Sequence, residues 1–184
     1  MYDALVLAGG SARRLDGADK PAELVGGVSL LDRVLTACAG AGRTVVVGPQ
    51  RPTARPVTWA REDPPGGGPV PALAAGLREV TAELVVLLAA DLPFLTAAVV
   101  ELLAAQAPAV LTDGTCPQWL CGAWQTARLR AAVAGAGPRL GDLLSSLGPR
   151  VVTWDGPDAP WTDCDTEQDL DDARRRVAWS SRSG

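Results

Sequence analysis

Short apolar runs alternate along the chain with longer segments in which apolar residues recur at helical spacing. The runs are rich in Val and Leu and are continuous, which is typical of strands buried on both faces of a sheet. This alternation predicts βα units stacked on a mostly parallel sheet. Strands are expected at residues 3–7, 44–47, 84–88, 109–111 and 151–154, with weaker ones at 57–59 and 120–123.

Six segments with helical spacing lie between or after these runs. Ser29, Thr96 and Thr166 stand where three of the helices begin, and all three are typical N-cap residues. Asp169 follows Thr166 at the spacing of a capping box with the shorter acid. The expected helices span residues 30–41, 71–80, 97–105, 127–133, 140–147 and 167–177.

Length and composition limit the organisation of the chain. Its 184 residues, 47% of them hydrophobic, suffice for one sizeable core but not for two ordinary domains. We therefore expect a single α/β domain over residues 1–179 and a disordered tail over 180–184. The net charge of -4 should repel polyanions, so no nucleic acid is expected as a partner.

The residue types that are absent or rare exclude several kinds of chemistry. Without histidine, the chain can build neither a Ser/His/Asp or Cys/His catalytic arrangement nor a His-ligated metal site. Four cysteines without a Cys-x-x-Cys pair predict free thiols in a reducing cytosol. No secretory signal precedes the first strand, and the longest apolar run, 84–90, is too short to span a membrane. We expect a soluble cytoplasmic protein without membrane contact.

A glycine-rich turn follows the first predicted strand. The chain passes through Gly9 and Gly10 and then gathers three cations, Arg13, Arg14 and Lys20. Missing side chains let backbone N–H groups approach phosphate oxygens, which Arg and Lys neutralise, so the segment favours a phosphate-binding loop. It matches neither Gly-x-Gly-x-x-Gly nor the P-loop. A pair of glycines alone would equally fit an ordinary βα turn with solvated cations.

The full string resembles the nucleotidyltransferase signature Leu-Ala-Gly-Gly-x-x-x-Arg-hydrophobic-x-Gly-x-Asp-Lys. The matches are Leu7, Ala8, Gly9, Gly10, Arg14, Gly17, Asp19 and Lys20. In this form the segment is most similar to the molybdenum cofactor guanylyltransferase family. The resemblance implies a three-layer α/β/α Rossmann-like nucleotidyltransferase fold, and it implies Mg²⁺-dependent transfer of GMP from GTP to molybdopterin. Asp16 departs from the family, which usually has Gly there.

An acidic residue, Asp91, stands just beyond the expected strand 84–88. Open α/β sheets bind ligands at the carboxyl ends of their strands, and carboxylate oxygens suit Mg²⁺. A turn former ahead of Pro93 is the alternative. The resemblance implies that Asp91 holds magnesium.

A second acidic stretch, 163–166, precedes the last helix and resembles a family motif with Asn at positions 163 and 165. It implies Asp165 as a second metal ligand.

The resemblance also assigns the remaining site residues. Arg14, Lys20 and Asp91 would be catalytic, and Asp19 is expected to orient Lys20 through an ion pair. A Pro-Val-Pro insertion at 69–71 interrupts the family's glycine-rich region that follows Asp63. The nucleotide would contact Leu7, Ala8, Gly9, Gly10, Lys20, Asp63 and Asp91.

Three other functions fit parts of this pattern. Molybdopterin cytidylyltransferases and sugar-phosphate nucleotidyltransferases share the chemistry, although the former more often carry Leu-Ala-Ala-Gly and the latter are usually longer. A silent nucleotide-binding scaffold would have no use for Arg14, Lys20, Asp91 and Asp165 together. The implied partners are GTP, molybdopterin and, transiently, proteins of molybdenum insertion or molybdoenzyme maturation.

Overall fold

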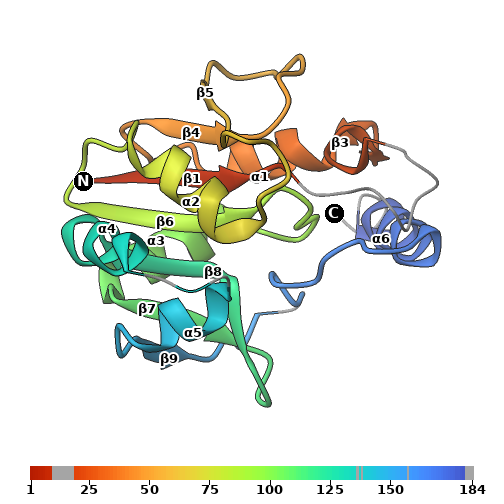
Figure 1. Ribbon diagram of the computed structural model, residues 1–184. Helices are drawn as coiled ribbons and strands as arrows, with labels where there is room; N and C mark the ends of the chain where they lie inside the picture. The colour runs from red at the N-terminus through yellow and green to blue at the C-terminus, as the bar shows by residue number, and fades with distance from the viewer. Residues whose placement is uncertain (10–18, 136, 138, 157, 181–184) are drawn as a thin grey trace.

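The computed structural model describes residues 1–9, 19–135, 137, 139–156 and 158–180. At its centre is a seven-stranded sheet with strand order β5-β4-β1-β6-β8-β7-β9 (Figure 1). The antiparallel pairs are those that β8 makes with β6 and β7, and the other pairs are parallel. The expected mostly parallel sheet is therefore confirmed. The strands are β1 (Tyr2–Leu7), β4 (Thr44–Val47), β5 (Thr58–Ala60), β6 (Leu84–Ala89), β7 (Ala109–Thr112), β8 (Pro117–Gln125) and β9 (Arg150–Val152).

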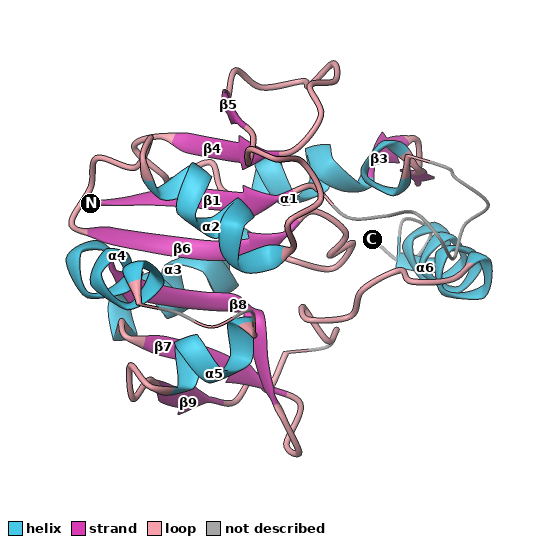
Figure 2. Cartoon of the chain, viewed as in Figure 1, coloured by secondary structure: helices cyan, strands magenta, loops and turns pink. Residues whose placement is uncertain are grey.

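Helices cover both faces of this sheet, as Figure 2 shows. One face carries α1 (Leu30–Ala37) and α3 (Ala97–Gln106), and the other carries α2 (Pro69–Leu77), α4 (Thr126–Ala134) and α5 (Leu140–Ser145). Successive side chains of a strand point to opposite faces. Accordingly, Val6 of β1 packs among the residues of α1 and α3, while Leu5 packs among those of α2. Continuous apolar strands thus serve two cores, which confirms the three-layer α/β/α arrangement.

A smaller unit stands beyond the carboxyl ends of the central strands (Figure 1). It consists of the hairpin β2 (Leu24–Val25) and β3 (Val28–Ser29), the short 3-10 helix η1 (Lys20–Ala22) and α6 (Glu167–Ser180). α6 packs on the hairpin through a small core of its own, formed by Val25, Leu30, Cys164, Leu170 and Ala173. The sequence analysis did not anticipate this hairpin.

The boundaries of several helices differ from those expected, and those of α1 and α2 have a clear cause. α1 ends at Ala37 because the chain tightens into a turn there, with the Gly42 N–H donating to the Tyr2 carbonyl before β4 begins. α2 begins at Pro69, so the Pro-Val-Pro stretch is its first turn and not a loop insertion. Proline is tolerated in the first turn because the N–H that it lacks has no partner inside the helix.

All three expected N-cap residues stand at the helix starts, and two of them cap through their side chains. Ser29 accepts a hydrogen bond from the Asp32 N–H at 3.0 Å. Thr166 and Asp169 form a reciprocal capping box, with the Thr166 N–H donating to the Asp169 carboxylate and the Asp169 N–H donating to the Thr166 hydroxyl. Thr96 stands at the start of α3 but makes no capping hydrogen bond through its side chain.

The cysteines and the helices bear on two further expectations. All four cysteines are free, as expected: Cys38, Cys116, Cys121 and Cys164. Within the part of the chain that the structure describes, no helix has the length and apolar character needed to cross a membrane.

Candidate active site

The carboxyl ends of β1 and β6 lie side by side at the centre of the sheet. The Ala90 N–H, just after β6, donates to the carbonyl of Leu7 at 3.1 Å. From β1 the chain builds β4 and β5 on one side and then β6 on the other, so this is the point where the strand order reverses. Open α/β sheets place their ligands at such switch points. Leu7 and Ala8 are buried here, while Gly9 is exposed.

A lysine and two carboxylates meet in front of this edge. Lys20 lies on η1, and its Nζ contacts the carboxylate of Asp91 and, at 2.7 Å, Oδ1 of Asp165. The side chains of Lys20 and Asp91 are each 17% exposed and that of Asp165 is 46% exposed. Residues far apart in the sequence thus form one half-buried charged cluster, which we call the Lys20 cluster.

The charge state of Lys20 follows from its partners. Burial alone would lower the pKa of Lys20, but the charge of Asp91 and the hydrogen bond to Asp165 outweigh it, and the pKa is raised. The ammonium is therefore charged at neutral pH. Burial raises the pKa of the nearby Asp163, and the charges of Asp165 and Asp91 raise it further. Negative charge is concentrated at this point, which favours binding of additional cations.

Buried neighbours fix the loop that carries Asp91. Leu92 and Leu95 are both buried in the core under α1 and α3. Arg33 of α1 donates through Nε to the Val25 carbonyl at 2.9 Å and through Nη1 to the Pro93 carbonyl at 3.5 Å. This arginine therefore links the β2–β3 hairpin to the loop after β6.

Asp165 lies in the segment that leads into α6. Its neighbour Cys164 is fully buried in the small core beneath that helix. Burial and the charge of Asp91 raise the pKa of the Cys164 thiol to about 12, so the thiol stays protonated. Cys164 anchors the segment, and the capping box of α6 holds it from the other side.

The donor set of the cluster fits a magnesium ion. Asp91 and Asp165 direct carboxylate oxygens toward the same point, which the Lys20 ammonium occupies. Among the described residues, no three Asp, Glu or Cys side chains are grouped so as to hold a metal ion. Mg²⁺ commonly takes one or two carboxylates and completes its shell with water and substrate phosphates. Two converging carboxylates meet that requirement.

The other expected site residues either lie apart from the Lys20 cluster or fall outside the described residues. Asp63 is exposed in the loop after β5 and makes no hydrogen bond or ion pair with the described residues of the Lys20 cluster. Gly10 and Arg14 lie outside the described residues. The expected ion pair between Asp19 and Lys20 is wrong: Asp19 pairs with Arg51, because Lys20 turns toward Asp91 and Asp165.

Gly48 brings the end of β4 against the end of β1. Its φ of 151° is one that residues with a side chain rarely adopt, and a Cβ built on it would lie 2.7 Å from the carbonyl oxygen of Ala8. Glycine is therefore required for this close approach.

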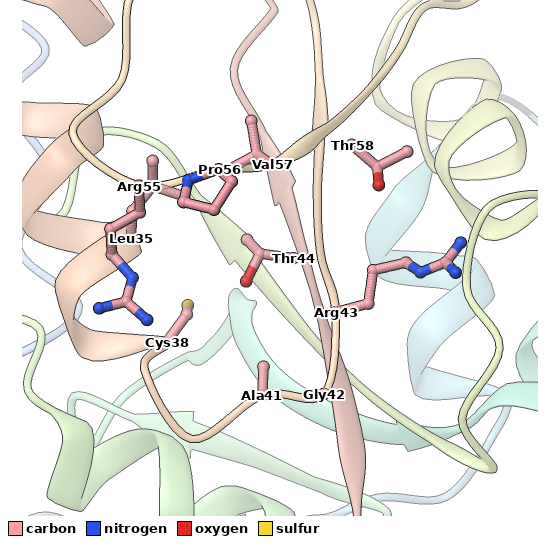
Figure 3. A pocket seen from close by; sticks show the side chains of 10 residues that line it. All are labelled: Leu35, Cys38, Ala41, Gly42, Arg43, Thr44, Arg55, Pro56, Val57 and Thr58. Carbon is pink, nitrogen blue, oxygen red and sulfur yellow. The ribbon is translucent and has the colours of Figure 1, made fainter.

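A cavity of about 380 Å³ lies at the amino end of β4, at the opposite end of the strand from the Lys20 cluster (Figure 3). Arg43 points away from Cys38 and Arg55 and donates to the carbonyl of Glu79 at 3.1 Å. Burial raises the pKa of the Cys38 thiol to about 12, so this thiol is not a nucleophile at neutral pH. The cavity takes no part in the Lys20 cluster.

Comparison with known proteins identifies the family of the chain. A family model described as the MobA-like NTP transferase domain matches residues 4–153. The chain belongs to this family. A protein named molybdenum cofactor guanylyltransferase from Acidiphilium cryptum is 30% identical to this MobA-like chain in an alignment that covers 92% of each protein. The chain is accordingly a nucleotidyltransferase.

Solved structures share the fold of this MobA-like chain. Molybdopterin-guanine dinucleotide biosynthesis protein A from Archaeoglobus fulgidus superposes with a TM-score of 0.76 at 20% identity, covering 96% of this chain and 99% of the other. The 2-C-methyl-D-erythritol 4-phosphate cytidylyltransferase from Thermus thermophilus superposes with a TM-score of 0.71 at 21% identity, covering 97% and 100%. Proteins named for different bases therefore share one fold.

Sequence reasoning missed two residues that shape the site of this MobA-like protein, Arg33 and Arg51. Neither belongs to a motif, and each contacts residues distant in the sequence. One signal was available for Lys20 itself: of the 17 basic residues it is the sole lysine, the others being arginine. A compact ammonium and a planar guanidinium are not interchangeable, so a single lysine among arginines singles out Lys20 as a candidate site residue.

Proposed function

We propose that this chain transfers GMP from GTP to the terminal phosphate of molybdopterin, with release of pyrophosphate and a requirement for Mg²⁺. The observation that carries the proposal is the Lys20 cluster, in which an ammonium is held between Asp91 and Asp165 at the carboxyl edge of the sheet. The 30% identity with a molybdenum cofactor guanylyltransferase supports the choice of both substrates. We further propose that the protein acts in the cytoplasm and transiently meets proteins of molybdenum insertion or molybdoenzyme maturation.

The proposed roles of Lys20, Asp91 and Asp165 are supported by their charge and position, and those of the other residues by the resemblance of the motifs. Lys20 and Arg14 stabilise charge on the α-phosphate and on the departing pyrophosphate, while Asp91 and Asp165 hold the metal ion. When bound, Mg²⁺ neutralises charge on the phosphates of the two substrates. The nucleotide contacts Leu7, Ala8, Gly9, Gly10, Lys20, Asp63 and Asp91.

The reaction suits a chain without histidine. An oxygen of the molybdopterin phosphate attacks the α-phosphorus of GTP, and the bond from that phosphorus to the bridging oxygen of pyrophosphate breaks. A phosphate monoester has a second pKa of about 6, so the attacking oxygen is already largely deprotonated at neutral pH. No general base is needed. The protein's task is to position the phosphates in line and to offset their charge.

Incubation with α-³²P-labelled GTP, molybdopterin and Mg²⁺ tests the proposal. We expect a labelled dinucleotide, release of pyrophosphate and a marked reduction of both, to a residual but measurable rate, in Lys20→Met. Arg43→Met is the matched control, because Arg43 is a basic residue at the opposite edge of the sheet. Transfer from CTP in preference to GTP would indicate a cytidylyltransferase. Absence of transfer from either nucleotide would overturn the proposal.

A further inference from the structure

Arg51 carries a charged group that is almost completely withdrawn from water. It lies in the segment after β4, and its side chain is only 8% exposed. Its Nε donates to Oδ2 of Asp19 at 3.0 Å and its Nη2 donates to Oδ1 at 2.8 Å. This is the two-pronged geometry in which a planar guanidinium binds a carboxylate most strongly.

The same guanidinium also reaches the end of β1. Its Nη1 donates to the carbonyl of Ala8 at 3.5 Å. Ala8 is itself fixed, since its N–H donates to the Val47 carbonyl at 2.8 Å and Gly48 lies directly against it. Arg51 therefore joins Asp19 to the rigid centre of the sheet.

Asp19 immediately precedes the lysine of the Lys20 cluster. Its carbonyl accepts a hydrogen bond from the Ala22 N–H at 2.8 Å, so Asp19 begins the turn that forms η1. Holding Asp19 in place consequently fixes the backbone from which the Lys20 side chain extends. A long lysine side chain is flexible, and its reach depends on where its backbone starts.

We propose that Arg51 is a positioning residue for Lys20: its paired hydrogen bonds to Asp19 set the backbone of η1 so that the Lys20 ammonium reaches the reacting phosphates. This inference rests on the proposed function. Arg51 acts through Asp19 and Lys20 and does not itself bind the nucleotide, because each of its three nitrogens donates to Asp19 or Ala8 and its side chain is almost completely buried.

A set of combined substitutions tests the proposal. We expect Arg51→Met to lower kcat by up to about 10²-fold, the size of loss that a displacement of about 1 Å can cause, with a smaller change in KM for GTP. Asp19→Ala should reproduce this loss, and Arg51→Lys should recover only part of the activity because it lacks the planar fork. The double variant Arg51→Met/Lys20→Met should be no slower than Lys20→Met alone.

Three kinetic outcomes would overturn the proposal. These are an unchanged kcat in Arg51→Met, losses that multiply in the double variant, and a loss in Arg51→Met that Asp19→Ala does not share. The last two would indicate that Arg51 contacts the nucleotide itself. Arg43 is an arginine that flanks the other end of β4, so Arg43→Met is the matched control and should keep the wild-type kcat.

A second measurement does not depend on turnover. Because Lys20 is the sole lysine, an amine-reactive reagent can label only Lys20 and the chain's amino terminus, and peptide mapping separates the two. We expect faster labelling of Lys20 in Arg51→Met and in Asp19→Ala, since Lys20 would leave its carboxylate partners. Unchanged labelling in both variants, with the fold verified by circular dichroism, would overturn the proposal. If the wild type transfers no GMP, the proposed function fails and labelling alone decides the role of Arg51.

Discussion

Asp3 and Asp91 are both withdrawn from water, yet their surroundings differ. Asp3, at the start of β1, is 2% exposed. Its Oδ2 accepts hydrogen bonds from the Thr81 N–H at 2.7 Å, the Ala82 N–H at 3.0 Å and the Thr81 hydroxyl at 3.2 Å. Asp91, beyond the end of the neighbouring strand, instead faces the ammonium of Lys20.

The contrast separates a structural carboxylate from one that can take a ligand. The donors around Asp3 belong largely to the backbone and cannot leave without local unfolding. The ammonium near Asp91 is carried by a side chain with four rotatable bonds, so a metal ion or a phosphate can draw it away at low cost. We therefore expect substitutions at Asp3 to change stability and substitutions at Asp91 to change activity.

The largest expected effect is that of Asp91→Ala on turnover. We predict a loss of kcat on the order of 10²–10³-fold, the range seen when one group that stabilises transition-state charge is removed. The melting temperature should change little, because Asp91 accepts no set of backbone hydrogen bonds from the described residues like the set that Asp3 accepts. Steady-state kinetics and thermal unfolding of the same preparation test both statements. A stable Asp91→Ala variant with wild-type turnover would remove Asp91 from the site.

The converse substitution, Asp3→Ala, should act on stability. It leaves the N–H groups of Thr81 and Ala82 without the charged acceptor that they share, which costs about 1–3 kcal/mol of unfolding free energy. Denaturant unfolding measures this loss. The fraction that remains folded should turn over at the wild-type rate. A reduced kcat in that fraction would contradict a purely structural role for Asp3.

Asp165 offers a graded test within the cluster. Asp165→Asn keeps one oxygen acceptor but removes a charge, so we expect a loss of kcat within about tenfold, in line with a single charge-assisted hydrogen bond. Asp165→Ala removes both and should lose more. Parallel kinetics at several Mg²⁺ concentrations compare the two variants. Equal activity of Asn and Ala at this position would argue against Asp165 as a metal ligand.

The raised pKa of Lys20 predicts the smallest effect, a slow reaction with amine reagents. Only the neutral amine reacts, and a raised pKa leaves less of it at any pH below the pKa. Labelling of Lys20 should therefore need a higher pH than labelling of an ordinary lysine. Asp91→Asn should shift the labelling profile to lower pH. A wild-type profile that matches a free lysine would contradict the charge coupling within the cluster.

The sheet and its layers were predictable because they depend on local patterns. Continuous apolar runs such as residues 84–88 become strands buried on both faces, and the helices between them follow from spacing. The β2–β3 hairpin was missed because each strand has only two residues. A signal was present, since Gly26-Gly27 between the apolar residues Val25 and Val28 favours a tight hairpin turn, and both glycines have positive φ.

The site was predictable in part. Lys20 and Asp91 follow from the motif and from the position of Asp91 after a strand, but their contact depends on how the chain folds back. The partner of Asp19 shows the limit of sequence reasoning: the neighbouring Lys20 looked suitable, while the real partner, Arg51, lies 32 residues away. Such contacts depend on the packing of β1 against β4, which includes the close approach at Gly48.

A calorimetric titration with GTP, performed with Mg²⁺ and again with excess chelator, shows whether the Lys20 cluster is a metal-nucleotide site. We predict GTP binding that needs Mg²⁺, is lost in Asp91→Ala and is retained in folded Asp3→Ala. Binding that survives both the chelator and Asp91→Ala would contradict a metal-nucleotide site at the Lys20 cluster.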